Sequence, residues 1–147
     1  MSSSTSASKV SFFFQANIHL TNRRFLKGFI VALFKREAKP LRQINFIFCS
    51  DKQLLDINRK FLQHDYYTDI ITFDLSEEEE DGVIAEVYIS VDRVRENSRD
   101  HGVTLREELH RVIFHGALHL CGYKDKKPNQ QAEMRKKEDF YLRKYFH

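Results

Sequence analysis

The stretch FHGALHLCGYKD, residues 114–125, places His115 and His119 four residues apart and Asp125 six residues after the second histidine. An α-helix turns about 100° per residue, so side chains four positions apart lie on the same face. If this segment is helical, both imidazoles can face a single metal ion. Most neighbouring residues are apolar, and an imidazole in apolar surroundings needs a partner. A metal site meets that need, and the alternative is a histidine pair hydrogen-bonded within the core.

The helix that carries this pair is predicted over 104–122. Thr104 stands three residues before Glu107, which is the spacing of a capping box, and Gly122 is typical of the residue that ends a helix. The turn after Gly122 can bring a side chain of 123–127 back to the ion. Zinc suits such a site, because a catalytic zinc uses three protein ligands and keeps one position open for water.

Gly116 narrows the reaction class. Zinc peptidases with the motif H-E-x-x-H place a glutamate directly after the first histidine, where it serves as general base. Gly116 occupies that position here, which argues against a thermolysin-like protease. A glycine beside the first histidine also lets backbone or substrate approach closely.

Hydrophobic periodicity along the rest of the chain predicts an alternation of strands and helices. We expect strands at 10–18, 42–50, 69–75 and 83–90, and helices at 20–39, 51–62, 90–102, 104–122 and 129–146. In the first helix, the residues at helical spacing that we expect to face the core are Phe25, Phe29, Ala32 and Leu33.

The chain shows no internal repeat and no sign of a second domain. We therefore expect the α+β class: a flexible Ser-rich leader at 1–9, then one metal-dependent hydrolase domain over 10–147. Its mixed sheet should have about four strands packed with about five helices, with the metal site at the end of the histidine-bearing helix. With 147 residues, of which 41% are hydrophobic, the chain can bury a core of its own.

Charge and cysteine content restrict the partners and the compartment. The net charge is only +3, but residues 124–147 hold eight Lys and Arg against four Asp and Glu. Such a basic end can meet phosphates or be a solvated helix surface. Cys49 and Cys121 form no CxxC pattern, so we expect free thiols. No apolar run of about 18 residues exists, and no secretory signal is evident, so we expect a cytoplasmic protein without a membrane span.

Three segments resemble one known family. HGALHLCGYKD, followed by AEMRKKE at 132–138, is similar to the signature H-G-x-L-H-L-x-G-x-D-H of the YbeY family of endoribonucleases. DINRKFLQHDYYTDIITFDL at 56–75 resembles the family block L-N-x-x-(Y/F)-R-x-x-D-x-x-T-(D/N)-V-L-(S/T)-F. AEVYIS at 85–90 resembles its GDIxIS strand, so the likeness extends from about Asn45 to Glu138.

The resemblance implies a specific activity and a specific cofactor. It implies one Zn²⁺ ion held by three side chains and a metal-dependent ribonuclease specific for single strands. It further implies a role in maturing the 3′ end of small-subunit ribosomal RNA and in ribosome quality control, so the expected partners are ribosomal RNA and the small ribosomal subunit. Glu138 matches a late glutamate of the family and can support a metal ligand.

The chain departs from the family pattern at the third ligand. The family usually has a histidine ten residues after the first ligand, and this chain has Asp125 there, preceded by Lys124 in place of an aspartate. Carboxylate oxygen is a legitimate zinc ligand, so we expect His115, His119 and Asp125 to hold the metal. An aspartate lowers the net charge of the site and should make bound water less acidic. The alternative is an exposed loop aspartate, with water or a distant residue completing the site.

A second departure concerns catalysis. Leu62 stands where the family has an arginine thought to hold substrate phosphate or aid catalysis. Arg59, one turn earlier on the same face, can substitute in catalysis and in substrate binding. His64 can position water or contact phosphate, and Lys124 can hold the RNA backbone. For each of these residues an ordinary solvated surface position is the alternative.

These observations favour a zinc-dependent endoribonuclease. Two alternatives stay open: a ribosome-associated RNA-binding factor whose metal is mainly structural, and a metal-dependent hydrolase of another substrate. The sequence identifies no general base.

Overall fold

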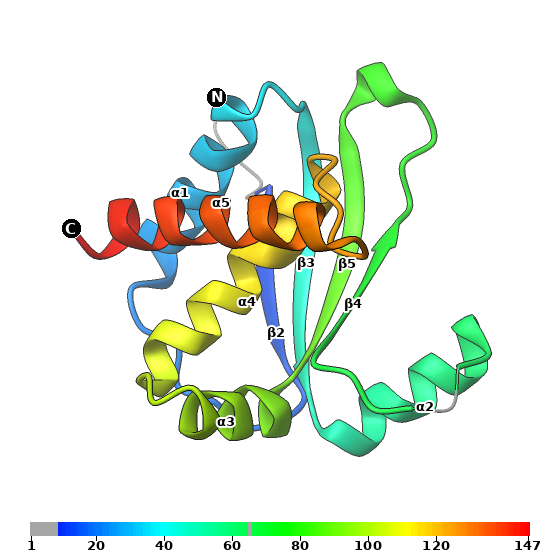
Figure 1. Cartoon of the computed structure of the whole chain (residues 1–147). Coiled ribbons are helices and arrows are strands. Elements are labelled where there is room, and N and C mark those ends of the chain that lie inside the picture. The colour runs from blue at the N-terminus through cyan, green and yellow to red at the C-terminus, as the bar shows by residue number, and fades with distance from the viewer. Residues whose placement is uncertain (1–8, 65) are drawn as a thin grey trace.

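The computed structural model describes residues 9–64 and 66–147, so all of the predicted leader except Lys9 lies outside the described residues. The order of elements confirms the predicted α+β class (Figure 1). In chain order they are β2 (Val10–Phe14), α1 (Arg23–Arg36), β3 (Leu41–Cys49), α2 (Asp51–Leu62), β4 (Ile70–Asp74), the 3-10 helix η1 (Glu79–Asp81), β5 (Val83–Ser90), α3 (Val91–Asp100), α4 (Leu105–Leu120) and α5 (Pro128–Phe146).

The four strands form one mixed sheet, as predicted, and their order is β2-β3-β5-β4. β2, β3 and β5 are parallel, and β4 runs antiparallel to β5. Parallel neighbours need crossover connections, and α1 provides the one between β2 and β3. β2 ends four residues earlier than expected, because the N–H groups of Gln15 and Ala16 both donate to the carbonyl of Phe48 instead of continuing the ladder.

The core lies between one face of the sheet and the helices α1, α4 and α5 (Figure 1). Alternation along β3 turns Ile44, Phe46 and Phe48 to this face, and all three are fully buried. α2 packs on the opposite face, where Leu54 contacts Cys49 and Ile71 in a smaller cluster. None of the described helices is both long enough and apolar enough to cross a membrane.

The expected core face of α1 was wrong at Phe25 and Ala32 and right at Leu33, and Phe29 is partly buried against the core. The buried residues are Leu26, Ile30, Leu33 and Phe34, whereas Phe25 is 59% exposed and Ala32 is also exposed. Both sets have helical spacing, so periodicity alone could not separate them. The aliphatic stripe is the one that packs into the core. The aromatic stripe lies beside it, and its Phe29 contacts the rings of Phe114 and Tyr145.

Both cysteines are free, as expected. Cys49 is buried and Cys121 is half-buried. Burial raises the pKa of Cys49 to about 11 and that of Cys121 to about 12. Thiols with such pKa values stay protonated near neutral pH and are poor nucleophiles.

Helix α4 begins and ends as predicted. The Thr104 hydroxyl accepts a hydrogen bond from the Glu107 N–H at 3.0 Å, and the chain leaves the helix through Gly122 at a φ of +111°. Between these ends Gly116 packs directly on the sheet. A Cβ at this position would lie 2.9 Å from Val87 Cγ1 and 3.0 Å from Ile70 Cδ1. The glycine therefore brings α4, and His115 with it, close to the start of β4.

Gly116→Ala is expected to destabilise the protein by about 1–3 kcal/mol, because the added methyl group overpacks the contact between α4 and the sheet. Gly28→Ala is the matched control, since Gly28 lies within α1 and a Cβ there would meet no neighbouring side chain within 4 Å. That exchange should stabilise by about 0.5–1 kcal/mol, because alanine favours a helix over glycine. Urea unfolding of both variants measures the difference, and equal midpoints would contradict the packing argument.

Candidate functional site

His115 on α4 lies between two carboxylates from different parts of the chain. Its Nδ1 is 2.6 Å from Oε2 of Glu138 on α5, and its Nε2 is 3.2 Å from Oδ2 of Asp125 in the loop after α4. Burial lowers the pKa of His115, but the hydrogen bond to Glu138 and the charges of the nearby carboxylates outweigh burial. The pKa of His115 therefore lies above its ordinary value of 6.5.

Glu138 is itself held by a cation. Nη1 of Arg111 donates to its Oε1 at 2.9 Å, and Nη2 of the same guanidinium donates to Asp139 Oδ1 at 2.7 Å. Glu138 is nearly buried, so this pairing fixes the carboxylate that orients His115. The result is a chain of contacts from Arg111 through Glu138 and His115 to Asp125.

A cavity of about 490 Å³ opens beside this chain of contacts. The residues lining it come from the start of β4, from α3, α4 and α5, and from the loop after α4. They are Thr68, Asp69, Ile70, Asn97, His101, Glu108, Arg111, Val112, His115, Asp125, Gln131, Met134, Arg135 and Glu138. Four carboxylates thus face one cavity, a composition that attracts cations.

Two of these carboxylates have perturbed pKa values. Burial raises the pKa of Asp69, and the charges of Glu138 and Asp125 raise it further, while His115 counteracts them. Burial also raises the pKa of Glu108, against the lowering effect of His101 and Arg111. Perturbed pKa values in groups that line one cleft are a feature of functional sites.

His119 is placed differently from His115. Its side chain is exposed, its Nδ1 lies 3.1 Å from the carbonyl oxygen of Tyr123, and it is not among the residues that line the cavity. Within the part of the chain that the structure describes, no three His, Cys, Asp or Glu side chains are grouped closely enough to hold a metal ion.

The donor set nevertheless fits a zinc ion in its chemistry. In both His115 and His119, Nδ1 meets an oxygen acceptor, a carboxylate in one case and a carbonyl in the other. Such a partner keeps the proton on Nδ1 and leaves the Nε2 lone pair available, which is the arrangement typical of metal-ligating histidines. Asp125 adds an oxygen donor 3.2 Å from one of these Nε2 atoms.

The loop that carries Tyr123 and Asp125 is fastened by Glu37, at the end of α1. The Tyr123 hydroxyl donates to Glu37 Oε1 at 2.7 Å, Lys137 Nζ donates to Oε2 at 3.3 Å, and the Tyr141 hydroxyl donates to the same oxygen. Burial raises the pKa of Glu37, but these three hydrogen bonds outweigh it and leave the pKa below 4.5. Glu37 thereby holds the residue whose carbonyl orients His119.

Glu37→Gln is expected to remove an acid-sensitive part of the stability. Because the folded-state pKa of Glu37 is lowered, its contribution is fully present above the unfolded pKa near 4.5 and is lost as pH falls through the folded pKa. Urea unfolding at a series of pH values should therefore show the wild type more stable than the variant near neutrality. The two should converge below pH 4.5. A pH-independent gap would contradict this role.

Besides His119, three predicted site residues are not among those that line the cavity. Arg59 is on the exposed side of α2, Lys124 is exposed in the loop, and His64 stacks on Tyr66 with ring centroids 5.1 Å apart. Their proposed contacts with substrate stay predictions. Among the described lining residues, sequence reasoning missed Asp69, Glu108 and Arg111 as parts of the site.

A signal for two of the missed residues was available. Glu108, Arg111 and His115 recur at i, i+3 and i+7, so extending the histidine stripe toward the start of α4 would have found them. Asp69 has no such helical spacing, but it occupies the (D/N) position of the motif T-(D/N)-V-L-(S/T)-F that residues 68–73 resemble.

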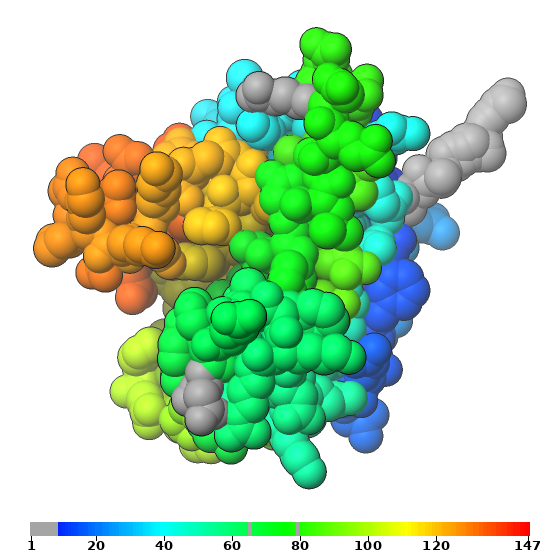
Figure 2. All heavy atoms as spheres, turned by 90° about the vertical axis from the view of Figure 1, so that its right-hand side faces the viewer, coloured from blue at the N-terminus to red at the C-terminus, as the bar shows by residue number. Residues whose placement is uncertain are grey.

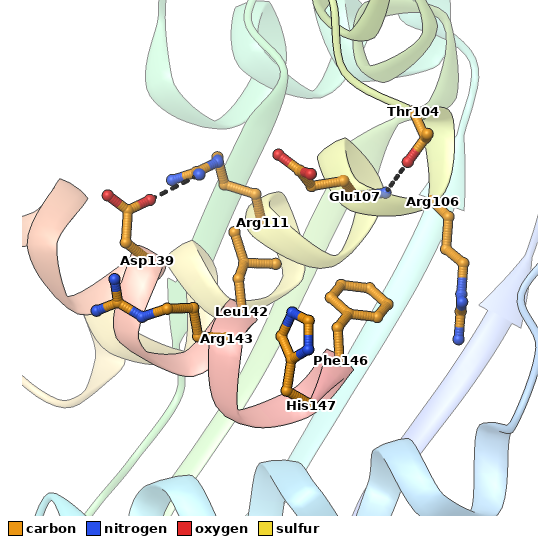
Figure 3. Close-up of a pocket in the computed structure, with 9 residues that line it drawn as sticks. All are labelled: Thr104, Arg106, Glu107, Arg111, Asp139, Leu142, Arg143, Phe146 and His147. Atoms are coloured by element: carbon orange, nitrogen blue, oxygen red, sulfur yellow. Dashed lines mark hydrogen bonds and ion pairs between the residues drawn. The ribbon is translucent and has the colours of Figure 1, made fainter.

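A second cavity, of about 370 Å³, lies between the start of α4 and the end of α5 (Figure 3). Figure 3 shows Arg111 pointing to Asp139, and Arg111 lines this cavity as well as the first. Arg106 and Arg143 add positive charge, which Glu107 and Asp139 partly offset. The two cavities therefore share Arg111 as a lining residue.

The fold and the site define an α+β protein with a carboxylate-rich cleft around a half-buried histidine. The family model described as endoribonuclease YbeY matches residues 12–146. The chain belongs to the endoribonuclease YbeY family, as its motifs indicated.

Individual relatives are similar to this protein over most of its length. Endoribonuclease YbeY of Cytophaga hutchinsonii is 45% identical over 133 residues, covering 89% of this chain and 92% of the relative. Endoribonuclease YbeY of Bacteroides thetaiotaomicron is 48% identical over 101 residues, covering 69% and 72%. A Thermotoga maritima protein of known solution structure is 27% identical with a TM-score of 0.60, covering 93% of this chain and 89% of that one.

Proposed function

We propose that this chain is a zinc-dependent endoribonuclease specific for single-stranded RNA. It acts in the cytoplasm on the 3′ end of small-subunit ribosomal RNA and in ribosome quality control. The observation that carries the proposal is His115, whose two ring nitrogens meet Glu138 and Asp125 at the edge of a carboxylate-lined cavity. Membership of the endoribonuclease YbeY family supports RNA phosphodiester bonds as the target.

The residues that would hold the zinc ion are His115, His119 and Asp125, as the sequence predicts. When bound, zinc supplies a Lewis acid for a phosphoryl oxygen and lowers the pKa of water. His119 and Asp125 flank the turn at Gly122, and Asp125 Oδ2 lies 3.2 Å from His115 Nε2.

The surrounding side chains prepare the site. Glu138 accepts the Nδ1 proton of His115 and fixes its tautomer, and Arg111 keeps Glu138 in position. Asp69, whose carboxyl has a raised pKa, is the cavity group suited to accept a proton from the attacking nucleophile. Lys124, Arg59 and the basic residues of α5 would hold the RNA backbone, and their contribution should weaken as salt rises.

The test compares cleavage of single-stranded and duplex RNA by the purified protein, with added zinc and with a chelator. We expect cleavage of the single strand, little cleavage of the duplex, and loss of activity in chelator that zinc restores. Equal cleavage with and without zinc, or cleavage of the duplex at the same rate, would contradict the proposal.

A second candidate is a ribosome-associated RNA-binding factor whose metal is mainly structural. The observation in its favour is Leu62, which replaces the arginine of the family pattern and has an exposed side chain. A rescue experiment separates the two functions. If His119→Ala restores ribosomal RNA maturation in cells lacking the protein, binding suffices; if it fails while remaining folded, hydrolysis is required.

A further inference from the structure

The end of α2 and the residues that follow it expose a concentration of large hydrophobic side chains. Seven such side chains are exposed among the described residues, and four of them lie within 61–67, namely Phe61, Leu62, Tyr66 and Tyr67. A cluster of exposed apolar side chains on a folded protein indicates a binding surface. Figure 2 shows α2 exposed at the lower centre of one face of the molecule, between α3 and β2.

Tyr67 is held in place by contacts on one face of its ring. Cζ of Arg93, on α3, lies 4.8 Å from the ring centroid. Arg93 is itself fixed, because its Nε donates to Asp51 Oδ1 at 3.1 Å. The tyrosine side chain is still 51% exposed, so surface remains available for a ligand.

Tyr66 is supported in a comparable way. Its ring stacks on His64 at 5.1 Å with an interplanar angle of 20°, and its hydroxyl lies 2.9 Å from His64 Nδ1. Its carbonyl accepts a hydrogen bond of 2.8 Å from Nδ2 of Asn58, which is 1% exposed. The aromatic side chains therefore stand on an anchored backbone, which lowers the entropy cost of binding.

Tyr67 directly precedes, along the chain, two residues of the cavity that contains His115. Thr68 and Asp69 follow Tyr67 directly and line that cavity, and the Asp69 carbonyl accepts a hydrogen bond from Ser90 N–H at 2.9 Å. On α3, Arg93 lies four residues before Asn97, another lining residue, so the two share a helix face. A strand with one phosphate in the cavity would pass Tyr67 with a neighbouring base.

We propose that Tyr67, backed by Arg93, is a base-stacking platform for single-stranded RNA, and that Tyr66 on His64 supplies a second ring. The inference rests on the proposed nuclease function and explains its preference for single strands. Unpaired bases can stack on aromatic side chains, whereas bases in a duplex are stacked on one another.

The combination of exposed aromatic rings and nearby cations favours RNA over a protein as the ligand of this surface. Cations accompany the rings, with Arg93 against Tyr67 and Lys60 Nζ 5.5 Å from the ring centroid of Phe61. Aromatic rings interspersed with cations match a polyanion that carries flat bases. Because Tyr67 directly precedes two lining residues, a substrate strand that enters the cavity can run past the platform.

The experiment measures binding separately from cleavage. The probe is a fluorescent 2′-O-methylated oligoadenylate, whose integrity is checked on a gel, and its duplex form serves as the second ligand. We expect Tyr67→Ala to weaken single-strand binding about tenfold while duplex binding stays unchanged. Tyr67→Phe, which keeps the ring, should bind like the wild type. Phe13→Ala, which removes a 50% exposed aromatic from the edge strand β2, should also do so.

Cleavage assays on the same variants complete the test. Tyr67→Ala should raise KM for single-stranded RNA with little change in kcat, because the platform binds substrate without touching the reacting atoms. Equal binding by the wild type and Tyr67→Ala overturns the platform and leaves the nuclease proposal intact, with a protein partner as the occupant of the exposed rings. Binding that depends on Tyr67 without any RNA cleavage by the wild type overturns the nuclease instead, and absence of binding overturns both.

Discussion

His115→Ala is expected to abolish both zinc binding and RNA cleavage. The substitution removes the imidazole that meets both Glu138 and Asp125, so the predicted ion loses a ligand and the two carboxylates lose the group between them. Zinc content after dialysis and the cleavage rate on single-stranded RNA measure the effect. We expect no retained zinc and a rate equal to that of a chelated wild-type sample.

His19→Ala is the matched control, because His19 is an exposed histidine between β2 and α1. Its zinc content and activity should equal those of the wild type. If His115→Ala kept its zinc and its activity, the metal site would have to lie elsewhere on the protein. A thermal unfolding curve for each variant shows whether a loss reflects the site or the fold.

Substitutions of Asp125 are expected to change zinc affinity and the pH dependence of cleavage, with an effect second only to that of His115→Ala. Asp125→Ala removes the predicted oxygen ligand, so zinc affinity should fall by more than the 10–100-fold typical of residues that only support a ligand. Asp125→His restores the ligand type common in the family and should keep the metal. Because the site then carries one negative charge fewer, water should become more acidic and the pH–rate profile should shift to lower pH.

Zinc affinity, measured by chelator competition, and the pH dependence of cleavage test Asp125→Ala and Asp125→His. Lys124→Ala provides a neighbouring loop change that leaves all three predicted ligands in place. It should preserve zinc affinity and weaken RNA binding at low salt. An unchanged zinc affinity in Asp125→Ala would mean that this aspartate is an exposed loop residue and that another group completes the site.

Much of the fold was readable from local patterns. Capping signals at Thr104 and Gly122 bounded α4 to within two residues, and alternation in β3 identified the buried face of Ile44, Phe46 and Phe48. These features depend on residues close together in the chain, so periodicity and turn chemistry suffice. The buried face of α1 was misjudged because its two apolar stripes had equally good helical spacing.

In the candidate site, too, some features follow from the local sequence and others only from tertiary packing. The amino-acid sequence alone determined that His115 and His119 share a helix with a carboxylate soon after it, because a helix repeats every 3.6 residues. Only the tertiary structure decided that Glu138 and Asp125 meet opposite nitrogens of His115 and that Asp69 shares their cavity. Those groups come together through the packing of α4, α5 and β4, and such packing depends on the close contact at Gly116 and on other interactions between residues far apart in the chain.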